Sequence, residues 1–328
     1  MSKEIKRIGV FTSGGDAPGM NAAVRAVVRY ATYKGLHVYG IKHGYEGMIA
    51  GDIERLETKS VRNIIHRGGT ILKTARSKAF MTPEGRKLAY ESLKSYDIDA
   101  CVAIGGNGTF TGAKVFGEEF PDISFIGVPG TIDNDIFGTD YSIGFDTAVN
   151  TAVEAVDRIR DTADAHSRLF FIEVMGRHSG AIALYTGIGS GASGILLPEV
   201  TSDASTLINL LKKGIKRKKL FSLVVVAEGD ETGGAMAIAE KVKEQFPEYE
   251  TKVAIIGHLQ RGGSPSAADR VLATRLGYGA VEGLIQGKSD VMAGSINNRV
   301  AYTSFDDAIN KSKELNQDLL ELAEILAL

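Results

Sequence analysis

Two carboxylates stand two residues apart in the segment PGTIDND, residues 129–135, directly after a short apolar run. If this segment is extended, Asp133 and Asp135 point to the same side of the chain. One carboxylate can then take a proton from a substrate hydroxyl while the other helps to hold a metal ion. The alternative is a purely structural turn, because Asp and Asn are common in turns that follow strands.

Two glycine-rich segments have the composition of phosphate-binding turns. SGGDAPGMN, residues 13–21, and GGNGTF, residues 105–110, each leave an apolar run and enter a helical pattern. Glycines in such a turn let backbone N–H groups and a helix N-terminus face one anion. A tight strand-to-helix turn without a ligand is the alternative for either segment alone. Two such turns together favour a ligand with several phosphates.

Other polar side chains also follow apolar runs. They are Met175-Gly176-Arg177, Glu228, and His258 with Arg261. Arginine binds phosphate through its forked guanidinium, and glutamate accepts hydrogen bonds from hydroxyls. This set suits an anionic ligand that carries several hydroxyl groups.

The elements that must position these residues alternate along the chain. Eight short apolar runs predict strands: KRIGVFTSGG, HVYGIKHG, DACVAIGG, ISFIGVPG, RLFFIEVMG, GILLPE, SLVVVAEG and KVAIIGHL. Apolar residues with helical spacing predict helices at residues 21–35, 59–69, 83–96, 145–166, 202–219 and 267–287. Continuous apolar strands that alternate with helices predict an α/β fold of mostly parallel sheets, with helices on both faces. Ligands of such folds bind at the carboxyl ends of the strands.

Composition excludes several other classes of protein. The 328 residues allow about two domains. With 38 basic and 40 acidic side chains the net charge is −2, so we expect no nucleic-acid partner. No apolar stretch is long enough to cross a membrane, and the single Cys101 and the lack of a signal-peptide pattern predict a cytoplasmic location. GSGASG, residues 189–194, fits a dinucleotide motif but stands before a strand rather than after one, so we do not assign it to a cofactor.

Six ordered motifs resemble those of the bacterial ATP-dependent 6-phosphofructokinase family: TSGGDAPGMN, RGGT, GGNG, PGTIDND, EVMGR and GHLQRGGSP. The resemblance implies two Rossmann-like three-layer domains. It places the larger, ATP-binding domain at residues 1–143 plus about 259–310 and the smaller, sugar-phosphate domain at 144–258 plus about 311–328. It also implies a homotetramer that uses MgATP to phosphorylate the 1-hydroxyl of fructose 6-phosphate.

Roles carried over from the family fall into three groups. The resemblance implies catalytic roles for Asp133 as the base, Thr131, Asp135 and Arg177, with Asn107 and Asp135 at the Mg²⁺ site. The ATP contacts would be Gly15, Tyr45, Arg76, Ser77, Gly106, Asn107, Gly108 and Thr109. The sugar phosphate would contact Thr131, Ile132, Asp133, Met175, Gly176, Arg177, Glu228, His258 and Arg261, with Arg168 and Lys252 supplied by a neighbouring subunit.

The choice of phosphoryl donor depends on two glycines. Pyrophosphate-dependent relatives carry an acidic residue and a lysine at the positions of Gly108 and Gly130. Without those side chains the α-phosphate of a nucleotide has room, which favours ATP. Two alternatives stay open: a pyrophosphate-dependent enzyme, and a non-catalytic sugar-phosphate or nucleotide-binding regulator.

Several positions depart from the family pattern. Asn107 replaces a family aspartate at the metal site, Lys252 replaces an arginine, and Ser77 replaces a phenylalanine. The effector site is matched by Arg25, Arg29, Arg160, Arg217 and Lys219, but Thr58-Lys59 and Ser193 replace the expected Arg-Tyr pair and Glu. The incomplete match argues against control by ADP or phosphoenolpyruvate.

Overall fold

The computed structural model describes residues 5–166, 168–200, 222–229, 233–247 and 250–326. The chain forms two compact units. The first unit contains residues 1–131, 136–146 and 261–313, and the second contains residues 132–135, 147–260 and 314–328. The chain therefore passes from one unit to the other on both sides of the segment 132–135.

The first unit is built on a seven-stranded sheet with the order β11-β10-β5-β4-β1-β2-β3. Its strands are β1 (Arg7–Thr12), β2 (His37–Ile41), β3 (Ile53–Leu56), β4 (Ala100–Gly105), β5 (Ser124–Pro129), β10 (Val291–Ile296) and β11 (Arg299–Ser304). The central pairs are parallel, and only the edge strands β3 and β11 pair antiparallel to their neighbours. From β1 the chain continues to β2 on one side and later to β4 on the other. Ligands of open α/β sheets bind at such a reversal point.

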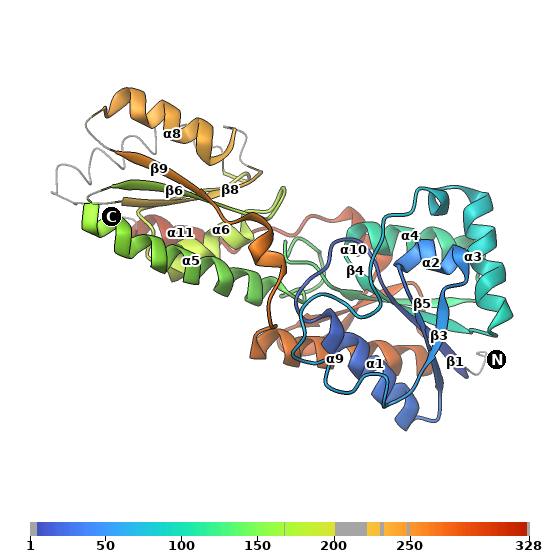
Figure 1. Cartoon of the computed structure of the whole chain (residues 1–328). Coiled ribbons are helices and arrows are strands. Elements are labelled where there is room, and N and C mark those ends of the chain that lie inside the picture. Colours follow the sequence, from blue (N-terminus) through green and yellow to red (C-terminus); the bar gives the residue numbers. More distant parts are fainter. Residues whose placement is uncertain (1–4, 167, 201–221, 230–232, 248–249, 327–328) are drawn as a thin grey trace. The chain divides into compact units, whose positions relative to one another are not determined.

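Helices cover both faces of this sheet (Figure 1). α1 (Met20–Tyr33) and α9 (Ala267–Ile285) pack together on one face. The other face carries α2 (Gly44–Ala50), the short 3₁₀ helix η1 (Ala79–Met81), α3 (Pro83–Ser95), α4 (Asn107–Glu119) and α10 (Phe305–Asn310). Local sequence sets the starts of α3 and α9. At α3, Thr82 precedes Pro83 and its side chain accepts a hydrogen bond from the Gly85 N–H. At α9, the Ser266 side chain accepts one from the Asp269 N–H. Both are standard N-cap arrangements.

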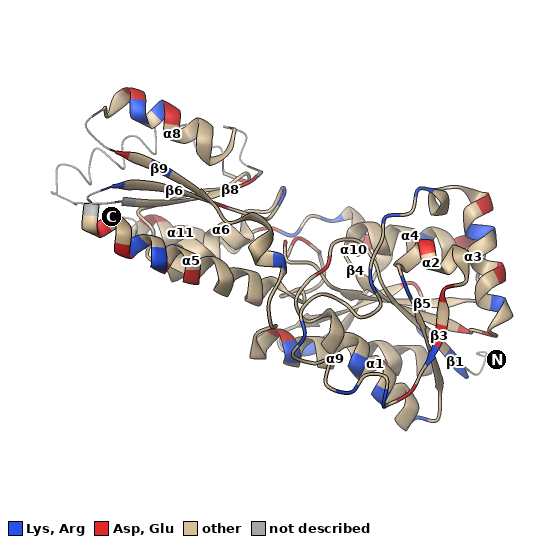
Figure 2. Ribbon diagram, viewed as in Figure 1, with Lys and Arg blue, Asp and Glu red and all other residues tan. Residues whose placement is uncertain are grey.

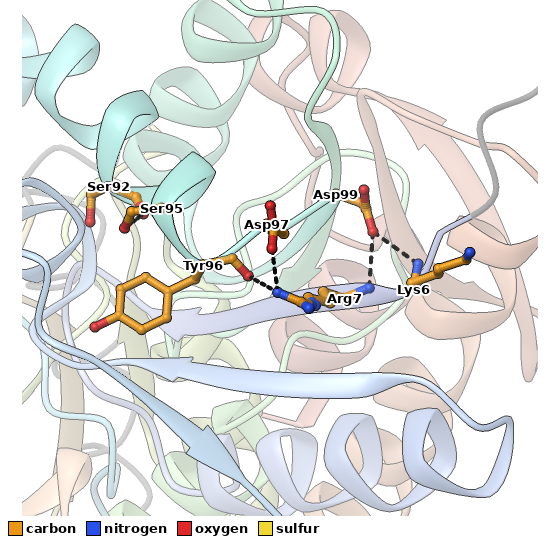
Figure 3. A network of polar contacts seen from close by, with 7 residues as sticks. All are labelled: Lys6, Arg7, Ser92, Ser95, Tyr96, Asp97 and Asp99. Atoms are coloured by element: carbon orange, nitrogen blue, oxygen red, sulfur yellow. Dashed lines mark hydrogen bonds and ion pairs between the residues drawn. The ribbon is translucent and has the colours of Figure 1, made fainter.

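Polar contacts fix the amino ends of the strands, far from the carboxyl ends. The Asp99 carboxylate accepts hydrogen bonds from the backbone N–H groups of Lys6 and Arg7 (Figure 3). The Arg7 guanidinium donates to the Tyr96 carbonyl and to the Asp97 carboxylate. These contacts tie the start of β1 to residues 96–99, which follow α3. They hold β1 in place, and with it the glycine-rich turn at the other end of this strand.

The second unit has a four-stranded sheet with the order β7-β8-β6-β9. Its strands are β6 (Leu169–Val174), β7 (Gly194–Leu196), β8 (Ser222–Ala227) and β9 (Thr251–Ile255), and all its pairs are parallel. α8 (Gly234–Gln245) covers one face, and α5 (Phe145–His166), α6 (Ala181–Gly189) and α11 (Gln317–Leu326) lie on the other (Figure 1). Its core includes Phe171, Val224, Val226 and Ile238. Figure 2 shows that α3, α5 and α8 each carry both acidic and basic residues.

The structure confirms the α/β class with mostly parallel sheets, and all eight expected strands are present. The helix expected at residues 59–69 is wrong: this segment forms separate turns, and Asn63 adopts a left-handed φ of 57° that interrupts a helix. The helix expected at 202–219 lies outside the described residues. The segment GSGASG runs from the last residue of α6 to the first residue of β7, the helix-then-strand order that a dinucleotide site does not have. Among the described residues no helix combines the length and the apolarity that crossing a bilayer requires.

Candidate active site

The two glycine-rich turns lie side by side in the first unit, at the carboxyl ends of β1 and β4. The Ser13 N–H donates to the Ile104 carbonyl over 3.0 Å, and the Thr109 hydroxyl donates to the Ser13 carbonyl over 3.2 Å. A β-carbon on Gly105 would stand 2.5 Å from that same carbonyl oxygen, so only glycine permits this approach. The reversal point of the sheet therefore carries both turns, as a site for a polyphosphate requires.

Asn107 opens α4, and its side-chain oxygen is buried without a hydrogen-bond partner among the described residues. Burying a polar atom without a hydrogen-bond partner costs free energy, so Oδ1 is a candidate contact for a bound ligand. Next to it, a β-carbon added to Gly108 would meet no heavy atom within 4 Å. A β-carbon on Gly130 would instead lie 3.2 Å from both Ile104 and Met20. Of the two glycines in the donor argument, Gly108 faces open space and Gly130 faces the core.

Tyr45 packs against the second glycine-rich turn and makes a hydrogen bond to it. Its side chain is buried, and its hydroxyl donates to the Thr109 carbonyl over 2.5 Å. The ring stacks on Phe80 with a centroid distance of 3.9 Å, and burial raises the pKa of Tyr45 well above its ordinary value. Tyr45 therefore acts as a neutral hydrogen-bond donor that holds the first turn of α4.

The segment that carries Arg76 and Ser77 is fastened to the first turn. The Thr74 hydroxyl donates to the Gly14 carbonyl over 2.6 Å, and the Ser77 hydroxyl accepts from the Phe80 N–H over 3.1 Å. Arg76 is exposed. Ser77 thus has a local role in starting the 3₁₀ turn that presents Phe80 to Tyr45.

Arg261 lies over the first glycine-rich turn. Its Nη1 donates to the Asp16 carbonyl over 3.2 Å, and a β-carbon on Gly15 would stand 2.8 Å from this nitrogen. Because position 15 has no side chain, the Arg261 guanidinium can approach the backbone of this turn closely. The structure groups Arg261 with the residues expected to bind ATP.

Asp133 and Arg177 meet within the second unit. Asp133 is 4% exposed, and its Oδ2 lies 3.7 Å from the Arg177 Nε. The side chain of Arg177 is more than half exposed, and its backbone adopts a left-handed φ of 54°. A buried carboxylate beside an accessible guanidinium is an arrangement that can take up a proton and stabilise a transferred anion. In the neighbouring residues of the same segment, the Thr131 carbonyl accepts a hydrogen bond from the Ser142 hydroxyl. Ile132 is buried, and Asp135 is half-buried.

The turn Met175-Gly176-Arg177 after β6 is shaped by two side chains from other strand ends. Oε1 of Glu228 accepts from the N–H groups of Gly176 and Arg177, over 3.3 and 2.8 Å. Oε1 of Gln260 accepts from the Met175 N–H over 2.8 Å, and Gln260 is fully buried. Gln260 was not among the predicted site residues, although a glutamine inside the motif GHLQRGGSP was a usable signal. His258 is exposed on the 3₁₀ helix η2 (Gly257–Arg261).

Arg168 and Lys252 come together at the opposite, amino ends of β6 and β9. Each binds one oxygen of Glu250: Arg168 Nε to Oε2 and Lys252 Nζ to Oε1, both over 2.7 Å. Arg168 first, and then Lys252, lower the pKa of Glu250 to about 2. β6 has six residues at about 3.3 Å each, so roughly 20 Å separates its two ends. In one chain these cations therefore lie far from Arg177.

The described residues that were expected at an effector site lie on different elements, and Lys59 and Arg160 each contact a different neighbour. Arg25 and Arg29 lie one turn apart on α1, and burial, followed by repulsion from Arg29, lowers the pKa of Arg25. Lys59 pairs with Glu57 over 3.0 Å, and Arg160 donates to the Ser190 carbonyl. Arg217 and Lys219 lie outside the described residues.

The α/β fold, the two adjacent glycine-rich turns of the first unit and the Asp133–Arg177 contact of the second are features that a phosphoryl-transfer enzyme of the α/β class would need. The chain belongs to the phosphofructokinase family, whose model matches residues 7–284. It is 54% identical to the ATP-dependent 6-phosphofructokinase of Cytophaga hutchinsonii over 322 residues, which cover 98% of each chain.

Solved structures agree with this assignment. The structure of phosphofructokinase from Saccharomyces cerevisiae superposes with a TM-score of 0.87 at 35% identity, and the match covers 98% of this chain and 46% of the yeast chain. A pyrophosphate-dependent phosphofructokinase from Nitrosospira multiformis gives a TM-score of 0.84 at 25% identity, over 95% of this chain and 86% of its own. The chain is thus much more similar in sequence to the ATP-dependent relative than to this pyrophosphate-dependent one.

Proposed function

We propose that this chain is an ATP-dependent 6-phosphofructokinase, which transfers the γ-phosphoryl group of ATP to the 1-hydroxyl of fructose 6-phosphate. The single observation that carries the mechanism is the contact between the buried Asp133 carboxylate and the Arg177 guanidinium. The 54% identity to an enzyme named for this activity supports the substrate assignment. The products are fructose 1,6-bisphosphate and ADP.

Asp133 acts as the general base. It takes the proton of the sugar 1-hydroxyl as this oxygen forms a bond to the γ-phosphorus, while the bond from that phosphorus to the bridging oxygen breaks and ADP leaves. Arg177 stabilises the charge on the transferred group, since phosphoryl transfer depends mainly on positioning and charge stabilisation. Burial keeps water from competing for Asp133.

The turn after β6 holds the sugar phosphate. Glu228 uses one carboxylate oxygen to fix the backbone of Gly176 and Arg177, which leaves its second oxygen for a substrate hydroxyl. Gln260 holds the Met175 N–H in the same way and is a positioning residue for this turn. His258 supplies a further polar contact to this ligand.

The two glycine-rich turns of the first unit hold the ATP phosphates. A β-carbon on Gly108 would meet no heavy atom within 4 Å, and this open space supports a place there for the α-phosphate that distinguishes ATP from pyrophosphate. Mg²⁺ bound to the phosphates would neutralise their charge during transfer. The unpartnered Oδ1 of Asn107 is a suitable oxygen toward this ion, and Asp135 would supply a carboxylate.

The quaternary structure belongs to the same proposal. A homotetramer with shared sites, located in the cytoplasm, would bring Arg168 and Lys252 of one subunit to the sugar phosphate of another. The distance of roughly 20 Å between the two ends of β6 supports this sharing, because one chain cannot bring both ends to one ligand.

The experiment that tests the function is an initial-rate assay with fructose 6-phosphate and Mg²⁺. ATP and pyrophosphate are compared at equal concentration, and fructose 1,6-bisphosphate is measured. Turnover with ATP alone is the expected result. Turnover with pyrophosphate alone would overturn the donor assignment but keep Asp133 as the base, and no turnover with either donor would favour a regulator.

A further inference from the structure

The amino ends of β6 and β9 carry a cluster of three charged residues that the catalytic mechanism above does not explain in full. Arg168 stands directly before β6, Glu250 stands directly before β9, and Lys252 lies in β9. The Leu169 N–H donates to the Glu250 carbonyl over 3.2 Å. The backbone of Glu250 is thereby tied to the start of β6. The carboxylate binds both cations at once, over 2.7 Å each. Two positive charges and one negative charge leave the cluster with a net charge of +1.

Glu250 occupies only part of the donor capacity of its partners. It takes the Nε of Arg168, which leaves both terminal nitrogens of the guanidinium free of this carboxylate. On Lys252 it takes one of three ammonium N–H donors. Because a guanidinium is planar, anchoring Nε sets the direction in which the two terminal nitrogens point. Those two nitrogens form the pair that binds a phosphate in fork geometry.

We propose that Glu250 is a positioning residue for sugar-phosphate binding: it holds Arg168 and Lys252 together as one preorganised phosphate-binding pair. This inference rests on the proposed function. Without the carboxylate, the two cations repel each other and each regains its rotamer freedom, both of which oppose binding of one phosphate. Like an ordinary glutamate, Glu250 is ionised throughout the neutral range, and its two cation partners lower its pKa further, to about 2.

The test is steady-state kinetics of Glu250→Gln. The amide keeps the size of the side chain and one acceptor oxygen, but its NH₂ group is a donor and repels the second cation. We expect KM for fructose 6-phosphate to rise about three- to tenfold, with kcat and KM for ATP changed less than twofold, since the chemistry lies at the other end of the strands. Glu244→Gln, an exposed glutamate on α8 in the same unit, is the matched control and should change none of these constants.

A double-mutant cycle shows whether Glu250 acts through its partner. On an Arg168→Ala background, Glu250→Gln should lose most of its effect on KM, since little remains to be positioned. An unchanged or lower KM for fructose 6-phosphate in the single variant would overturn the proposal and identify Glu250 as a competitor of the phosphate. Equal effects on both backgrounds would also overturn it. The wild-type rate with ATP is measured in the same series, so a failure of the proposed function is recognised separately.

Discussion

At the scale of single side chains, the mechanism places the proton transfer on one buried carboxylate. Asp133→Ser removes the base but keeps a small polar side chain. We expect kcat to fall by about two to four orders of magnitude, because a general base acts in the transition state, while KM for fructose 6-phosphate changes little. Asp318→Ser, which removes an exposed carboxylate from α11, is the control and should retain full activity. Unchanged turnover of the Asp133 variant would contradict the assigned role.

Asn107 is the position of the expected metal site at which this chain departs from its family in charge. Asn107→Asp places a full negative charge on the atom position that is now buried without a partner. Carboxylate oxygen is a stronger ligand for Mg²⁺ than amide oxygen, so the Mg²⁺ concentration for half-maximal rate should fall severalfold. A magnesium titration at fixed, saturating ATP measures this shift. No shift would show that the Asn107 oxygen does not serve the metal.

At the scale of elements, the sequence predicted the strands and the turns that follow them more completely than the helices. β1, β4, β6 and β8 are short apolar runs that end in glycine-containing turns, so the local pattern alone defines them. The segment 59–69 has helical spacing but forms turns, because contacts from α1 override the local preference. Asn21 binds the carbonyls of Arg67 and Gly68 and the N–H of Ile71.

The contacts among site residues were predictable only in part, for a related reason. Asp133, Arg177 and Glu228 are recognisable because each follows an apolar run. Gln260 and Glu250 act through contacts with residues 85 and 82 positions away, and no local pattern encodes such a distance. Gly108 faces open space and Gly130 faces the core, a difference that depends on Ile104 and Met20 packing near Gly130 and not on any local pattern.

The joint between α3 and α4 provides a test of stability at this scale. The buried Arg86 guanidinium binds both carboxylate oxygens of Glu119, over 2.6 and 2.7 Å, and donates to the Phe80 carbonyl. Glu119→Gln leaves this guanidinium without its counter-charge. Because about a third of the Glu119 side chain is exposed, solvent screening reduces the loss to about 1–2 kcal/mol, measured by denaturant unfolding. Glu91→Gln, in the exposed pair with Lys87, should cost less than about 0.5 kcal/mol.

The same pair predicts a dependence of stability on pH. Hydrogen bonding to Arg86 is the main cause that lowers the pKa of Glu119 below its ordinary value of 4.5. The ion pair therefore stabilises the fold fully above pH 4.5, and this stability is lost as the pH falls through the folded-state pKa. The stability difference between wild type and Glu119→Gln should shrink in acid. A difference that is constant from neutral pH to below that pKa would contradict the assignment of the loss to the ion pair.

At the scale of the whole molecule, the proposed sharing of sites between subunits predicts that two defective chains repair each other. Asp133→Ser destroys its own base but still offers Arg168 to a neighbour, and Arg168→Ala keeps its base but offers no guanidinium. Random pairing makes half of the pairs mixed, and each mixed pair contains one complete site, so coexpressed variants should regain roughly a quarter of wild-type activity at low fructose 6-phosphate. The comparison is with each variant expressed alone. Activity no greater than the average of the two separate variants would show that each chain builds its site from its own residues.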